Sequence, residues 1–423
     1  MSVPASPELG TVPTDAAPDP RRRIAWWLVP AVFLGVLVFL ALLELVTDAG
    51  DLTSSGALRA ALAATVPIML AGLGGLWAER AGVVNIGLEG MLILGTFGGA
   101  YFALEMGAWG GILGGVLFGA IGGLLHAVAT VIFGVDHIVS GVAINIIALG
   151  VVQYLAAVTF ADRDGGSTSQ SPGLPDLPAL TIDPLVESLG EIEQKDLFLV
   201  SELAAVARAL TNGLSILVVI AFGLVLLSWF LLWKTSFGLR LRSCGESPAA
   251  AESLGINVIR YKMIAVIVSG GLAGLGGTFL VMVASSAYRD GQTGGRGYIG
   301  LAAMIFGNWR PGGLIAGSAL FGYTETLGLR SGQESVHALL LALAVLALVF
   351  AIVQVVRRNL RTAALMTGAA AALALLYFSI DLVPGDFTTM TPYVVTLLVL
   401  AFASQRLRMP AADGQIYRKG SAG

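Results

Sequence analysis

Long apolar stretches, separated by short polar connections, follow one another along almost the whole chain of 423 residues. An α-helix needs about 20 apolar residues to cross a hydrocarbon core of roughly 30 Å. We therefore expect an all-α, polytopic membrane protein. The apolar stretches predict ten transmembrane helices, at 26–47, 58–77, 87–104, 109–133, 138–160, 213–233, 262–283, 337–356, 362–380 and 390–406. The membrane domain would cover 26–408, between an N-terminal tail at 1–25 and a C-terminal tail at 409–423.

The region 297–330 does not fit the spacing of the other helices. Its apolar run is only about a dozen residues long, too short to span, and ends at a turn formed by Gly307-Asn-Trp-Arg-Pro311. We predict a broken re-entrant hairpin that enters from the outside and returns through 312–329. Exposed turn backbone at membrane depth is tolerated only where protein or a cavity surrounds it. The hairpin should therefore pack inside the bundle.

Composition supports the membrane class. Hydrophobic residues make up 56% of the chain and charged residues 12%, against about 25% in soluble domains, and the mean hydropathy is +0.84. The single cysteine, Cys244, excludes an intramolecular disulfide and lies in a basic loop, as expected at a reducing cytosolic face. The net charge of −3 gives no indication of nucleic-acid binding, and we expect none.

The distribution of Lys and Arg predicts the orientation, because cytosolic loops carry an excess of both. If Arg21, Arg22 and Arg23 are cytosolic, the loop 234–262, with five basic and two acidic residues, is cytosolic as well. The loop 161–212, with nine acidic and three basic residues, then lies outside. Both termini are predicted to be cytosolic.

The stretch from Glu79 to Met91 places several polar side chains in an otherwise lipid-soluble region. Ionisable residues in membrane segments are costly, so they usually face a partner or a water-filled path. We predict Asn85 and Glu89 to line a substrate path, with Asn145 and Asn308 as weaker candidates, because amides and carboxylates can replace the water bound to a polar solute. Structural roles remain open for all four. Glu89 could instead pair with Arg80 or accept backbone hydrogen bonds, and the two other asparagines could join helices.

The cytosolic segment 245–256 has the sequence signals of a short helix. Ser247 can cap it, Pro248 suits the first helical position, and Gly255 can end it in the left-handed region. So short a helix is marginal in water, which predicts docking against another element or protein. A plain surface connector is the alternative.

Two further classes of site receive little support. His126, His137 and His337 do not have metal-ligand spacing, so no metal site is predicted, and His126 should be a packing residue. The sequence contains no Gly-x-x-x-x-Gly-Lys-Ser/Thr loop, so any ATP must be hydrolysed by another chain.

Four sequence blocks, in this order, resemble the permeases of bacterial ABC importers of the branched-chain amino acid/simple-sugar superfamily, and within it the nucleoside permeases. They are AERAGVVNIGLEGM (78–91), RSCGESPAAAESLGINVIRYK (242–262) with SGGLAGLGG (269–277), GRGYIGLAAMIFGNWRPGG (295–313), and PYVVTLLVLAF (392–402) leading to PAADGQIY (410–417). The acidic insert at 161–212 is longer than this family leads us to expect, and Trp309-Arg310 replaces a more polar turn.

The resemblance implies a non-catalytic permease subunit that binds no cofactor itself. Its partners would be two ATPase subunits that use ATP, a second permease in a heterodimer, an external substrate-binding lipoprotein and membrane lipid. The loop with a Gly-Glu-x-Pro-x-Ala-Ala pattern would be the coupling helix that docks on the ATPase. Here this assigns Gly245, Glu246, Pro248, Ala250, Ala251 and Gly255 to coupling.

Two other functional classes stay open. A self-powered, proton-coupled secondary transporter of a small polar solute would use Glu89 or Glu44 to carry protons. A membrane-embedded transferase would need convergent carboxylates or a cation site, and the acidic loop shows no such spacing.

Overall fold

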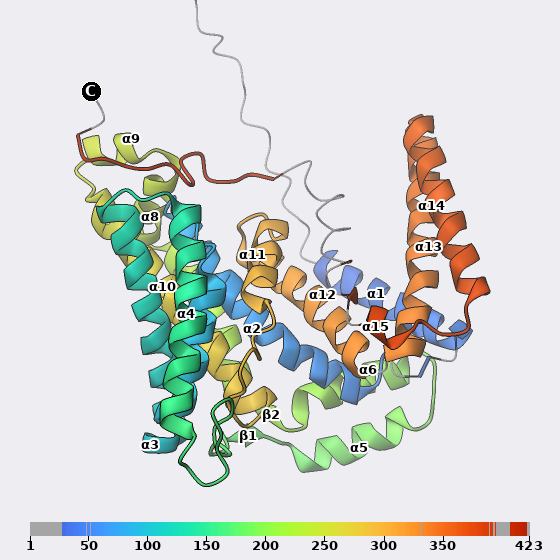
Figure 1. Cartoon of the computed structure of the whole chain (residues 1–423). Helices are drawn as coiled ribbons and strands as arrows, with labels where there is room; N and C mark the ends of the chain where they lie inside the picture. The colour runs from blue at the N-terminus through green and yellow to red at the C-terminus, as the bar shows by residue number, and fades with distance from the viewer. Residues whose placement is uncertain are drawn as a thin grey trace, which may run out of the picture.

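The structure is a computed structural model, which describes residues 28–47, 49–50, 52–330, 332–388, 390–391, 394 and 407–420. In this part of the chain the fold is almost entirely helical (Figure 1). The N-terminal tail, with Arg21 to Arg23, and most of the predicted helix 390–406 lie outside the described residues. The elements are α1 (Leu28–Thr47), α2 (Ser55–Arg80), α3 (Leu88–Ala127), η1 (Val128–Ile132), α4 (His137–Phe160), β1 (Ala179–Leu180), α5 (Asp183–Glu193), α6 (Val200–Thr211), β2 (Leu214–Ser215), α7 (Ile216–Lys234), α8 (Ser236–Glu246), α9 (Pro248–Ser253), α10 (Val258–Phe279), η2 (Leu280–Ala284), α11 (Arg296–Phe306), α12 (Pro311–Arg330), α13 (Gly332–Val356), α14 (Leu360–Ser379) and α15 (Gly385–Thr388).

Eight helical stretches of the described residues are long and apolar enough to cross a membrane. They are α1, α2, α3 with η1, α4, α7, α10 with η2, α13 and α14. These stretches account for nine of the ten predicted spans, because α3 contains two of them. The all-α, polytopic fold expected from the hydropathy pattern is therefore confirmed.

The helix α3 folds back on itself at Gly107, whose φ of 77° is rarely adopted by residues with a side chain. In a straight helix Gly98 and Gly114 would lie about 24 Å apart. Instead a Cβ atom on Gly98 would lie 2.6 Å from the carbonyl oxygen of Gly114. The rings of Phe97 and Phe118 are likewise only 5.6 Å apart. The two halves of α3 are thus antiparallel helices, in agreement with the predicted spans 87–104 and 109–133.

The helix α10 packs against both halves of α3 through glycines. A Cβ atom on Gly274 would lie 2.2 Å from the carbonyl oxygen of Gly115 in the second half of α3, and one on Gly277 would lie 2.2 Å from that of Leu92 in the first half. Residues without side chains allow helix backbones to approach closely in membranes, where van der Waals packing drives association. This contact fixes α10 against the two predicted spans that α3 supplies.

The helices α11 and α12 form the hairpin predicted from the short apolar run. Both pack along α2, and the turn at 307–310 lies beside the C-terminal end of α2. Gly300 of α11 and Phe321 of α12 are buried in this packing. The hairpin is therefore packed against α2, while Tyr298 of α11 and Leu320 of α12 remain exposed, so the expectation that it lies inside the bundle holds only in part.

The two ends of the bundle carry different structures (Figure 1). At one end lie α8, α9 and the C-terminal segment, which we call the Glu246 face; at the other lie α5 and α6, the α5–α6 face. The long acidic loop 161–212 is folded at this second face, where β1 pairs antiparallel with β2. Glu193 of α5 accepts hydrogen bonds from the backbone N–H of Ser55 (2.9 Å) and from Arg208 (2.8 Å). The insert is thus attached to the start of α2.

Candidate functional site

A buried polar centre forms where the first turns of α3 and α11 meet. Glu89 lies in the first turn of α3 and is 6% exposed. Its Oε1 accepts the backbone N–H of Gly295 (3.0 Å) and its Oε2 that of Gly297 (2.7 Å). The first N–H groups of a helix have no intrahelical acceptor and carry partial positive charge, so a carboxylate is stabilised there. Glu89 therefore caps α11 across the bundle and does not pair with Arg80, one of the roles considered from the sequence.

Asn145 of α4 joins three segments of this centre. Its Oδ1 accepts the backbone N–H of Gly90 (2.7 Å), while its Nδ2 donates to the carbonyl of Ile86 (3.0 Å) and to the hydroxyl oxygen of Tyr298 (2.9 Å). The non-helical stretch before α3 is thus held against α4 and α11. Tyr298 was missed as a site residue, although it lies within the block GRGYIG that carries the family resemblance.

Asn85 occupies the same non-helical stretch and is fully buried. Its Nδ2 donates to the hydroxyl oxygen of Ser269 on α10 (2.8 Å). No donor among the described residues reaches its Oδ1. A buried acceptor without a donor costs about 1–3 kcal/mol, so this oxygen is the unsatisfied polar atom of the centre and is suited to receive a hydrogen bond from water or solute.

Asn308 lies away from these three residues. It stands in the α11–α12 turn with a φ of 53°, and its Oδ1 accepts the backbone N–H of Arg408 (2.8 Å). The structure therefore brings together Asn85, Glu89 and Asn145 but places Asn308 at the Glu246 face.

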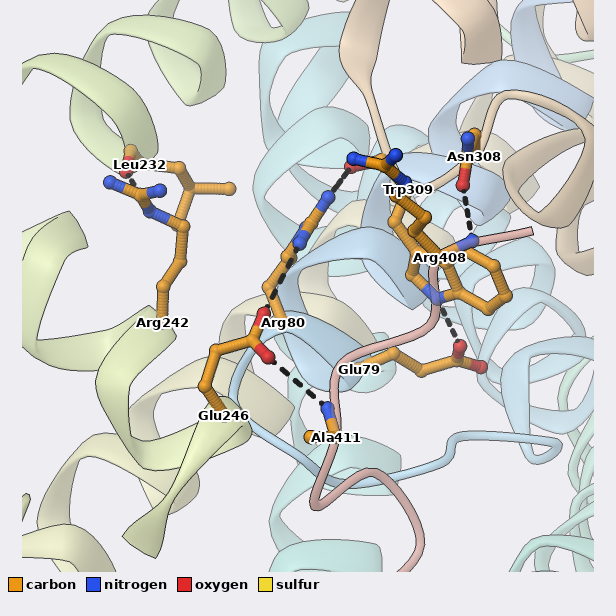
Figure 2. Close-up of polar contacts among 9 residues, drawn as sticks. All are labelled: Glu79, Arg80, Leu232, Arg242, Glu246, Asn308, Trp309, Arg408 and Ala411. Atoms are coloured by element: carbon orange, nitrogen blue, oxygen red, sulfur yellow. Dashed lines mark hydrogen bonds and ion pairs between the residues drawn. The ribbon is translucent and has the colours of Figure 1, made fainter. Parts of the chain in front are cut away.

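At that face the end of α2 is bonded to the hairpin turn and to α8 (Figure 2). Arg80 donates from Nε (3.1 Å) and Nη2 (2.6 Å) to the carbonyl oxygen of Trp309. Its Nη1 lies 3.9 Å from Oε1 of Glu246, and its guanidinium lies 5.5 Å from the ring of Trp233. Glu79 accepts the indole N–H of Trp309 (2.6 Å). These contacts join segments far apart in sequence, and no local pattern could have revealed them.

The segment 245–256 has the helix that its sequence signals predict, with one difference. Pro248 begins α9, and Gly255, with a φ of 80°, ends it. Ser247 precedes α9, but its side chain makes no capping hydrogen bond, so this expectation was wrong. Ser247 is also the last, capping residue of α8, where its backbone N–H donates to the carbonyl oxygen of Ser243.

The predicted coupling residues differ in exposure. Glu246 and Ala250 are exposed, whereas Gly245 and Ala251 are buried. Gly245 has no room for a side chain, since a Cβ atom there would lie 2.4 Å from the carbonyl oxygen of Arg80. The 245–256 segment is therefore attached closely to the end of α2 and still presents side chains to its surroundings.

A groove of about 410 Å³ lies beside α9. Arg240 and Arg260 line it and are exposed, and Leu254 at its edge has 82% of its surface exposed. Arg242 is instead used internally, since its Nε donates to the carbonyl of Leu232 (2.9 Å). The groove thus offers two cations and an apolar side chain to a partner.

The structure also shows the surroundings of His126 and Cys244. His126 is buried, and its ring nitrogens lie 2.9 Å from the hydroxyl oxygen of Ser140 and 3.1 Å from the carbonyl oxygen of Val84, as expected of a packing residue. Burial raises the pKa of the Cys244 thiol to about 11, so this thiol is protonated and poorly nucleophilic.

A multi-pass helical bundle with a broken hairpin and a buried polar centre is typical of a membrane transport protein. The chain belongs to the family described as branched-chain amino acid transport system / permease component, whose pattern matches residues 57–354. The resemblance inferred from the four sequence blocks is thereby confirmed.

The relatives of the chain include several named permeases. It is 32% identical over 374 residues to the guanosine ABC transporter permease protein NupQ of Bacillus subtilis, covering 85% of this chain and 96% of NupQ. It is 33% identical over 362 residues to the nucleoside ABC transporter permease protein NupC of Lactococcus lactis, covering 84% and 94%. A second guanosine permease of Bacillus subtilis, NupP, is 25% identical over 293 residues, covering 64% and 72%. No solved structure matches the chain significantly.

Proposed function

We propose that the chain is the membrane-spanning subunit of an ATP-driven importer that carries nucleosides, or related sugar-containing solutes, by alternating access. The names of NupQ and NupC, which match most of the chain, support this class of solute. The chain itself would bind no cofactor, and separate ATPase subunits would hydrolyse ATP. Its further partners would be an external substrate-binding lipoprotein and a second, related permease. That Bacillus subtilis has both NupP and NupQ supports a heterodimer.

In this proposal the Glu246 face is cytosolic and the α5–α6 face external, in a bacterial plasma membrane. The basic loop 234–262 and the described C-terminal segment 407–420 share the first face, and the acidic insert 161–212 lies at the second, which agrees with the distribution of basic residues. The segment 245–256 would be the coupling helix that docks on the ATPase. The groove with Arg240 and Arg260 would receive acidic side chains of that partner.

One observation carries the proposal: a short, continuous stretch of backbone connects the coupling segment to the polar centre. Arg80 lies 3.9 Å from Glu246, and the chain runs on from Arg80 through a non-helical stretch to Asn85 and Glu89. A displacement of the 245–256 segment would therefore be transmitted to the residues proposed to contact the solute. Asn85, Glu89 and Asn145 are buried here, so this conformation would be one in which the path is closed at their level.

The test uses the complete transporter reconstituted in vesicles with its ATPase subunits, second permease and receptor. Glu246→Ala should abolish guanosine uptake and the stimulation of ATP hydrolysis by loaded receptor, while the complex still assembles. Pro248→Gly should act in the same direction, because it removes the fixed start of α9. Ser253→Ala, an exposed change in the same helix, is the matched control. Full coupling in the Glu246 and Pro248 variants would reject the assignment.

The competing proton-coupled transporter is separated by its energy source. We expect uptake to continue when a protonophore dissipates the proton gradient at constant ATP, and to stop when ATP is withdrawn. The opposite result would favour the secondary transporter. Competition by excess ribose or glucose, compared with excess adenosine, shows whether the base of the solute or its sugar is recognised.

A further inference from the structure

The C-terminal segment 407–420 crosses the Glu246 face as an extended chain with turns (Figure 1), and it contacts most of the elements that meet there. At its start, the backbone N–H of Arg408 donates to Asn308 in the α11–α12 turn (2.8 Å). Near its end, the backbone N–H of Gly420 lies 3.3 Å from a carboxylate oxygen of Glu252 in α9. The segment therefore bridges the hairpin and the coupling helix.

Between these ends the segment is joined to α8. The backbone N–H of Ala412 donates to the carbonyl of Gly245 (2.9 Å), and that of Ala411 donates to Oε2 of Glu246 (3.3 Å; Figure 2). Glu246 thus interacts with the end of α2 through Arg80 and with the C-terminal segment through Ala411.

A buried polar chain passes through Asp413. The residue is 8% exposed, and its carboxyl group faces that of Glu79, with the ammonium of Lys262 nearby. Glu79 in turn accepts the indole N–H of Trp309, and Lys262 donates to the carbonyl of Gly82 (3.2 Å). No well-aligned donor among the described residues reaches either oxygen of Asp413, so this carboxyl group is a buried polar group without a donor. Asp413 thereby connects the hairpin turn, α2 and α10.

Tyr417 completes the attachment by packing on the apolar cluster of Cys244, Ala251 and Val258, which holds α8 and α9 against the start of α10. Ala251 is the buried side of the proposed coupling helix. The C-terminal segment therefore contacts both α9, through Tyr417, and the residue Gly245 that precedes it, through Ala412.

We propose that residues 407–420 form a strap that transmits motion between the coupling helix and the α11–α12 hairpin, with Tyr417 and Asp413 as its positioning residues. The strap gives the coupling helix a second mechanical route to the polar centre, because α11 begins at the N–H groups that Glu89 accepts. This inference rests on the proposed function of 245–256 as the ATPase-docking segment.

The packing of Tyr417 can be tested directly in the complete transporter. In Tyr417→Ala the ring that packs on Cys244, Ala251 and Val258 is lost, and we expect uptake and receptor-stimulated ATP hydrolysis to fall by about tenfold while the ATPase subunits remain bound. Tyr417→Phe, which keeps the ring, should retain coupling to within about twofold of wild type. Lys419→Ala, an exposed change in the strap, should behave as wild type.

Full coupling in Tyr417→Ala, or a loss of coupling in Tyr417→Phe as large as that in Tyr417→Ala, would overturn the strap. Asp413→Ala provides an independent variant, because it removes the carboxyl group that faces Glu79. It should lose coupling with the ATPase still bound, and unchanged coupling would contradict the inference. If Glu246→Ala and Pro248→Gly also leave coupling intact, the proposed function of 245–256 fails. If those two uncouple but the strap variants do not, only the strap fails.

Discussion

The indole N–H of Trp309 donates to Oε2 of Glu79 over 2.6 Å, although 230 positions separate the two residues. The same residue, through its carbonyl oxygen, accepts both hydrogen bonds from Arg80. The side chain and the backbone of Trp309 thus both fix the turn of the broken hairpin to the last two residues of α2.

Trp309→Phe removes the indole donor and leaves the buried Glu79 carboxyl with one partner fewer. Loss of a hydrogen bond to a buried group costs about 1–3 kcal/mol, so the midpoint of thermal unfolding in detergent should fall. Trp229→Phe, a change at an exposed tryptophan on α7, is the control and should unfold as wild type does. Equal midpoints for the two variants would show that this hydrogen bond contributes nothing to stability.

Glu89→Gln should lower nucleoside uptake more than it lowers expression. The amide group of glutamine would face one of the N–H groups at the start of α11, and the negative charge that complements this helix terminus would be lost. We expect uptake per assembled transporter to decrease by about tenfold, corresponding to about 1.4 kcal/mol. Glu105→Gln, at a partly exposed pair with Arg163, serves as the control. Transport at the wild-type rate would leave Glu89 with a structural role only.

Gly274→Ala should destabilise the bundle, whereas Gly271→Ala on the same helix should not. The added Cβ would lie 2.2 Å from the carbonyl oxygen of Gly115 in the first case, but 3.4 Å from the nearest atom, on Val116, in the second. Overpacking of this kind typically costs about 1–3 kcal/mol. Thermal unfolding of the two variants measures the difference, and similar midpoints would contradict the close approach of α10 and α3.

Asp413 predicts a dependence of stability on pH. Burial raises the pKa of Asp413 from 3.8 to about 7, against the opposing effects of Lys262 and Arg80. A carboxyl group with a higher pKa in the folded state binds more protons when folded, so its contribution to stability is complete below the unfolded pKa of 3.8 and is lost as pH rises from there through the folded pKa of about 7. Asp413→Asn, which is neutral at every pH, should therefore unfold like wild type below about pH 4 and at a higher temperature than wild type near about pH 8. A difference independent of pH would show that Asp413 does not titrate in this range.

The fold could be predicted well from sequence because its information is local. The length of the apolar stretches correctly predicted nine of the ten spans, all within the described residues. Gly255 ends α9 as expected. The short run before Asn308 correctly indicated a hairpin. The predicted side-chain capping bond of Ser247 is not formed. Ser247 also ends α8, and the position of that helix end could not be read from the segment 245–256 alone.

The arrangement of the candidate site could be predicted only in part. The polar character of Asn85, Glu89 and Asn145 was visible, because such residues are conspicuous among apolar ones. Their partners were not, since Tyr298 approaches Asn145 from a segment 153 positions away. Asn308 is a polar residue like the other candidates, but it lies at a different place in the fold, beside Arg408. Periodicity and composition do not specify that place.

The position of Gly420 beside Glu252 has a practical consequence for anyone who labels this protein. An affinity tag or fluorescent reporter attached by a short linker soon after Gly420 would lie close to α9, at the surface where the motor subunits are proposed to bind. Fusions for purification or imaging therefore belong in a long, flexible extension, or on the opposite side of the bilayer in the connection between α5 and α6.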